Sequence, residues 1–134
     1  MTPNKTRVPV MSGDDILMAR QKGRALAMEL GFEGADLTCI AAAISEVSRN
    51  IVEYAQRGEI ILQPLNNGAK RGLCVVACDQ GPGMANVTQA MQYGYSSRKG
   101  LGVGLPGAKL LMDEFQIVSK VGRGTTVTMK KWLV

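Results

Sequence analysis

The stretch DLTCIAAAISEVSRNIVEYA, residues 36–55, decides the fold of this chain. Its residues at helical spacing form one stripe that we expect to face a core: Leu37, Ile40, Ala41, Ile44, Ser48, Ile51 and Ala55. The stripe predicts one amphipathic helix from about residue 36 to 55. Glu46 and Asn50 lie one turn apart on nearly the opposite side, so their side chains converge on a common point.

The pair Glu46 and Asn50 has two interpretations. A solvated helix face is the common one for polar residues at this spacing. However, Asn is a poor helix former, and the small Ala42 and Ala43 leave room beside the pair. A carboxylate next to an amide oxygen can hold Mg²⁺ or act as a general base. Arg49, three residues after Glu46 and about 60° from its direction, can be no more than a surface partner or can belong to the pair.

Length and composition set the outer bounds. With 134 residues, 46% of them apolar, the chain fits a single domain over 1–134. No signal peptide is evident, and no apolar run approaches the roughly 20 residues of a membrane span. We therefore expect a cytoplasmic protein that binds no membrane, with three reduced, buried cysteines.

Charge and residue types exclude several functions. The net charge is +5, but the basic residues are scattered and only 4% of residues are aromatic, which argues against nucleic-acid binding. The chain has no histidine. Catalysis by Ser-His-Asp or Cys-His groups and phosphorylation of a histidine in this chain are therefore excluded.

The other elements predict an α+β fold. A strand at 6–12 precedes a helix at about 14–30, capped by Ser12 or Asp14 and stopped by Gly31. Strands 59–65 and 71–79 flank Asn66-Asn67-Gly68, which predicts a hairpin. A glycine-punctuated segment, 79–107, has one short helix near 88–92; a helix at about 105–113 and strands 115–121 and 124–134 follow. We expect a two-layer sandwich whose mostly antiparallel sheet is covered on one face by helices.

Three further groups are candidate site residues. Asp79 shares strand parity with Val75 and Ala77 and directly precedes Gln80-Gly81-Pro82-Gly83. It is either a solvent-capped turn residue or a half-buried acceptor for a group such as a purine amine, which Gly81 and Gly83 would let approach closely. Thr125 points inward with apolar company in the last strand, as a core residue or a ligand contact.

The third group is the run GLGVGLPG, residues 100–107. It contains GxGxxG, but no apolar strand precedes it and no acidic residue follows about 20 positions on, so it is no dinucleotide fingerprint. It also lacks the Walker P-loop pattern. A glycine loop that feeds a helix, with Pro106 in the first turn, exposes backbone N–H groups that suit phosphates, although a plain flexible linker would look the same.

The order of these motifs is more specific than any one of them. ExxxN on a helix, DxGxG after a strand, GxGxG before a helix and GTT in a terminal strand together resemble the Bergerat ATP-binding fold of the gyrase, histidine kinase and MutL (GHKL) superfamily. The stretches AISEVSRNIVEYA, CDQGPG, GYSS, GLGVGLPGAKLLMDEF and KKWLV resemble the small bacterial serine kinases of the anti-sigma and switch-kinase group over most of residues 38–134. Tyr93–Ser97 stands where histidine kinases carry a phenylalanine-rich lid motif.

The resemblance implies a role for each matching residue. Asn50 would hold Mg²⁺ on the phosphates of ATP, and Glu46 would orient or deprotonate a serine hydroxyl. Asp79 would accept from the adenine amino group, with Thr125 nearby through a water. The ring edge and the phosphate lid would be served by Gly81, Gly83, Gly100, Gly102 and Gly104.

The expected function is that of an ATP- and Mg²⁺-dependent protein-serine kinase. By resemblance it would phosphorylate STAS-domain antagonist or scaffold proteins of a stressosome-type complex and, once released, activate a PP2C-type phosphatase. One alternative is an anti-sigma factor that sequesters a sigma factor. Another is a nucleotide-gated binding module without transferase activity.

Overall fold

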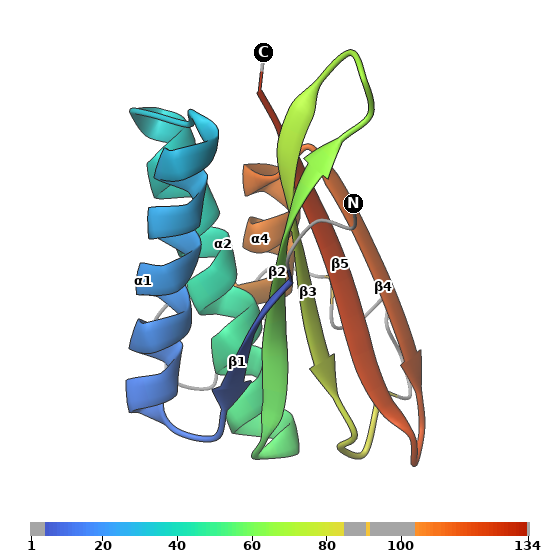
Figure 1. Ribbon diagram of the computed structural model, residues 1–134. Coiled ribbons are helices and arrows are strands. Elements are labelled where there is room, and N and C mark those ends of the chain that lie inside the picture. The colour runs from blue at the N-terminus through green and yellow to red at the C-terminus, as the bar shows by residue number, and fades with distance from the viewer. Residues whose placement is uncertain (1–4, 85–90, 92–103, 134) are drawn as a thin grey trace.

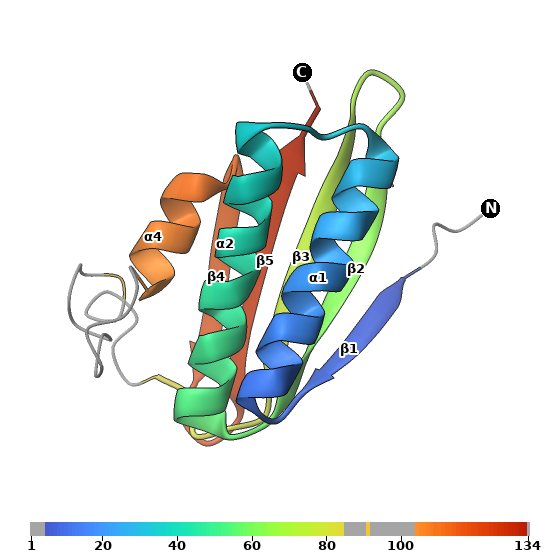
Figure 2. The same cartoon turned by 90° about the vertical axis from the view of Figure 1, so that its left-hand side faces the viewer.

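The computed structural model describes residues 5–84, 91 and 104–133. The described residues form two layers, a five-stranded sheet and a layer of helices on one of its faces (Figures 1 and 2). This arrangement confirms the expected α+β sandwich. The short helix predicted at 88–92 and the segment Tyr93–Ser97 lie outside the described residues, apart from Met91.

The sheet has the order β1-β2-β3-β5-β4, and each of its four strand pairings is antiparallel. Its strands are β1 (Thr6–Val10), β2 (Gly58–Asn66), β3 (Arg71–Asp79), β4 (Glu114–Lys120) and β5 (Gly124–Trp132). The hairpin of β2 and β3 forms as predicted, and β3 has the predicted bounds. The pairing of β3 with β5 places Asp79 opposite Thr125.

The first helix, α1 (Gly13–Leu30), ends as predicted but begins differently. Gly31 has a φ of 108°, and the next N–H, of Phe32, donates to the Ala27 carbonyl, so the helix ends in a left-handed cap. Ser12 is the N-cap residue, yet its side chain makes no capping hydrogen bond. Instead the Asp15 carboxylate accepts from the Met11 N–H at 2.8 Å, where it also faces the positive end of the helix.

The helix that carries the Glu46 and Asn50 pair is α2 (Ala35–Asn50), and it does not continue to residue 55 as an α-helix. Residues Ile51–Ala55 form a π-helix, η1, so the single helix predicted over 36–55 is wrong in its last five residues. Apolar spacing over five residues does not separate an α-turn from the wider π-turn. Asn50 therefore stands at the point where the backbone widens.

The core lies between the helices and the sheet, and the predicted α2 stripe faces it. Every residue of that stripe is buried except Ala55, which is half-buried. A Cβ added to Gly23 of α1 would lie 2.2 Å from the Ile44 Cδ1 atom, so α1 and α2 approach closely at this glycine. No helix of the described residues is long and apolar enough to cross a membrane.

A third helix, α4 (Gly104–Leu111), packs beside α2 (Figure 2). It corrects the expected surroundings of the Glu46 and Asn50 pair. Ala43 was expected to leave open room there, but it is fully buried, as is Val47. The α4 residues Leu105 and Ala108 are buried too. This side of α2 is therefore a second packed face, and Glu46 lies at its margin.

Candidate active site

Asp79 ends β3 on the face of the sheet that the helices cover. Its side chain is on the same side as the buried Val75 and Ala77, and the residue is only 9% exposed. Its Oδ1 atom accepts hydrogen bonds from the Gly81 N–H at 2.9 Å and the Thr125 N–H at 3.3 Å. Within the described part of the chain, no group donates a hydrogen bond to the Asp79 Oδ2 atom. The arrangement fixes the carboxylate and leaves one oxygen for a ligand's donor group.

Thr125 is buried, and its hydroxyl is hydrogen-bonded to Ser119, a residue that the sequence analysis did not single out. The Thr125 Oγ1 and Ser119 Oγ atoms are 2.7 Å apart, and the Met84 N–H donates to the same Ser119 oxygen at 2.7 Å. Ser119 alternates inward on β4 with Phe115 and Ile117, and this parity was the available signal. Ser119 thus ties the DQGPG loop to the end of the sheet.

Gly81 and Gly83 lie where neighbouring segments of the protein leave no room for a side chain. A Cβ on Gly81 would lie 2.5 Å from the Ala55 Cβ of η1. Gly83 has a φ of 75°, and a Cβ there would lie 2.1 Å from the Lys120 carbonyl oxygen. The loop after Asp79 therefore packs closely against η1 on one side and the end of β4 on the other. A contact of either glycine with a ligand ring stays a prediction.

Replacing Gly83 by alanine should destabilise the fold markedly. The added methyl group meets a backbone carbonyl that cannot rotate away, and the positive φ adds strain. We expect a loss of about 2–4 kcal/mol in the free energy of unfolding, measured by urea denaturation. Gly68→Ala is the matched control, because Gly68 has a φ of 91° but nothing within 4 Å of its added Cβ. Equal losses in both variants would contradict the steric argument.

Glu46 is held at both carboxylate oxygens. Oε1 accepts from the Gly104 N–H at 3.0 Å, and Oε2 accepts from the Arg49 Nη1 at 2.9 Å. The Glu46 side chain is 12% exposed and that of Arg49 is 37% exposed, so this is no fully solvated surface pair. Gly104, one of the predicted phosphate-lid glycines, is the first residue of α4. The structure therefore brings Glu46 and Gly104 together; Gly100 and Gly102 lie outside the described residues.

Asn50 is half-buried and is the last residue of α2. A Cβ on Gly58 would lie 2.9 Å from Cγ2 of Ile51, the next residue, and 3.0 Å from the Asp79 Cβ. The end of α2 and the end of β3 are thus neighbours. Among the described residues no three His, Cys, Asp or Glu side chains gather as a metal site. Such a set is not needed for Mg²⁺, which takes many of its oxygens from phosphates and water.

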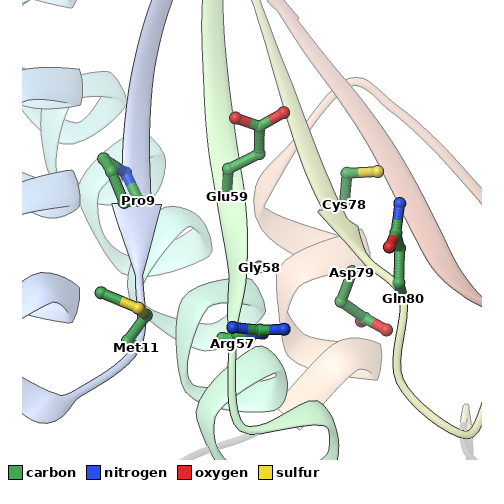
Figure 3. Close-up of a pocket in the computed structure, with 8 residues that line it drawn as sticks. All are labelled: Pro9, Met11, Arg57, Gly58, Glu59, Cys78, Asp79 and Gln80. Carbon is green, nitrogen blue, oxygen red and sulfur yellow. The ribbon is translucent and has the colours of Figure 1, made fainter.

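A groove of about 360 Å³ lies at the ends of β1, β2 and β3 (Figure 3). Pro9, Glu59 and Cys78 line it at paired positions of the three strands. By strand alternation these side chains point away from the helices, since Val8, Ile60 and Ala77 point into the core. The groove is therefore on the uncovered face of the sheet, and it shares only the end of β3 with the site of Glu46 and Asp79.

Comparison with known proteins places the chain in a family. The histidine kinase-like ATPase domain family matches residues 14–131, and the chain belongs to that family. Over 126 residues it is 47% identical to the serine/threonine-protein kinase RsbT of Bacillus subtilis, covering 94% of this chain and 95% of that protein. The expected class, a serine/threonine-protein kinase of the switch-kinase group, is thereby confirmed.

More distant relatives are anti-sigma F factors. The chain is 32% identical over 100 residues to that of Clostridium kluyveri, covering 72% of this chain and 70% of the relative. It is 29% identical over 139 residues to that of Clostridium novyi, covering 99% and 97%. Its relatives thus include a kinase and anti-sigma factors, and use of ATP by this chain follows from its class.

Proposed function

We propose that this kinase transfers the γ-phosphate of ATP to a serine of a STAS-domain antagonist or scaffold protein. The observation that carries the proposal is the placement of two carboxylates at one end of the helix-covered face. Asp79 is buried with one oxygen fixed, and Glu46 lies against the N-terminus of α4. The Asp79 carboxylate can accept a hydrogen bond from the adenine amine, and the Glu46 carboxylate can accept the proton of the acceptor hydroxyl.

The described residues can divide the work of phosphoryl transfer. The Asp79 Oδ2 atom would accept from the adenine amino group, while the hydrogen bond between Thr125 and Ser119 holds the strand ends next to Asp79 in place. The N–H groups at the start of α4 would face the phosphates, including that of Gly104, which donates to Glu46 in the structure. Glu46 takes the proton of the serine hydroxyl while the serine oxygen attacks the γ-phosphorus. The bond between the γ-phosphorus and the oxygen of the leaving ADP breaks in the same step.

The amide oxygen of Asn50 fits a magnesium site. Asn50 is half-buried at the end of α2, just before η1, whose Ala55 lies against Gly81 of the loop after Asp79, and its amide oxygen is a hard oxygen of the kind Mg²⁺ prefers. When bound there, Mg²⁺ would neutralise phosphate charge during transfer. The proposed compartment is the cytoplasm, and the proposed partner of the released kinase is a PP2C-type phosphatase; both rest on the likeness to RsbT and its group.

The direct test is transfer of labelled γ-phosphate from ATP with Mg²⁺ to a purified STAS-domain antagonist protein. We expect label on a serine of the acceptor and none when that serine is replaced by alanine. Tight ATP binding without labelling of the acceptor would contradict the proposed substrate and favour a nucleotide-gated module.

A second function has its own support. The chain is similar to an anti-sigma F factor over nearly its whole length, and this similarity supports sequestration of a sigma factor as a second function. Co-purification with a sigma factor, dependent on bound nucleotide, would favour this alternative. Binding of the PP2C-type phosphatase instead would favour the switch kinase.

A further inference from the structure

The start of α4 already holds an anion, and that anion is the side chain of Glu46. Gly104 opens α4, so its N–H is one of the helix's first donors and has no partner within the helix. The Glu46 Oε1 atom accepts from it at 3.0 Å. The positive end of the helix dipole adds to the attraction. A carboxylate therefore occupies a donor that a phosphate would use.

The second oxygen of Glu46 has a partner that does not depend on α4. Arg49 lies on α2, three residues after Glu46, and its Nη1 atom is 2.9 Å from Oε2. If Oε1 leaves Gly104, this contact within one helix can persist. Arg49 also neutralises the charge that would otherwise repel incoming phosphates.

We propose that the Glu46 carboxylate competes with nucleotide phosphates for the N-terminus of α4, and that Arg49 is a positioning residue that keeps Glu46 in place after the exchange. This inference rests on the proposed function, since it assumes that phosphates bind at α4. It makes Glu46 an internal substitute for phosphate in the empty protein. Before nucleotide binds, Glu46 thus gives the Gly104 N–H its acceptor.

The test compares nucleotide affinities of the unmodified chain and Glu46→Gln, measured by isothermal titration. Gln has the same shape but no charge, so ADP and ATP should bind about tenfold more tightly, the size of one charge-assisted hydrogen bond. Adenosine is the matched ligand control, because it carries no phosphate and its affinity should not change. Titrations in EDTA as well as Mg²⁺ prevent any effect on metal binding from hiding the gain.

Arg49 is tested in the same way with Arg49→Met and Arg49→Lys. The Met variant should bind ATP several-fold more weakly, because an unneutralised Glu46 holds α4 and repels phosphate, and Lys should restore much of the affinity. In the double variant Glu46→Gln/Arg49→Met, ATP should bind as tightly as in Glu46→Gln alone. A merely structural Arg49 would cause the same loss in both backgrounds.

The outcomes separate this inference from the proposed function. If the unmodified chain binds ATP and Glu46→Gln brings no gain, or brings an equal gain for adenosine, the competition is refuted and the kinase stands. If the unmodified chain binds no ATP, both fail.

Discussion

Asp79→Asn should abolish measurable ATP binding, with a loss of at least about a hundredfold. The amide oxygen can still accept from the N–H groups of Gly81 and Thr125, so the loop keeps its anchor. The amide nitrogen then takes the place of Oδ2 and presents a donor to the adenine amine, itself a donor. A buried site with two opposed donors loses the hydrogen bond and leaves both groups unsatisfied.

The measurement is isothermal titration with ATP, together with thermal unfolding to show that the variant folds. Asp36→Asn is the matched control, since its carboxylate is 45% exposed, lies 3.8 Å from the Lys131 Nζ and belongs to the first turn of α2, at the other end of that helix from Asn50. Guanine presents an acceptor where adenine has its amine, so Asp79→Asn should also shift preference toward GTP. Undiminished ATP affinity would contradict the adenine contact.

The sequence was sufficient to place Asp79 and Thr125. Strand alternation and the Asn-Gly turn fixed β3 at its observed bounds, and parity put both residues on the core face. The antiparallel pairing that sets them opposite each other needed only the right order of strands. These predictions depend on local periodicity, which a single sequence displays.

The surroundings of Glu46 could not be predicted in the same way. Its contact with Gly104 joins residues 58 apart in the chain and depends on how α4 packs against α2. The change from α2 to the π-turn of η1 leaves no mark in the apolar spacing. The sequence therefore left open whether Arg49 is only a surface partner, whereas packing makes Glu46 mostly buried.

Glu46→Ala should keep nucleotide binding and lose phosphate transfer. A general base acts on the acceptor hydroxyl and not on the nucleotide, and its removal costs about a hundredfold to ten-thousandfold in rate. Since the variant also frees the Gly104 N–H, its ATP affinity should be at least that of the unmodified chain. Loss of rate with affinity retained separates a catalytic role from one in folding.

The rate is measured in a single turnover with saturating ATP and Mg²⁺ and the STAS-domain acceptor. Glu29→Ala, on the exposed face of α1, is the control for loss of an acidic side chain. Equal transfer rates in Glu46→Ala and the unmodified chain would rule out Glu46 as the base. A variant that failed to bind ATP would instead give the carboxylate a part in holding the nucleotide, because removing a mere competitor cannot weaken binding.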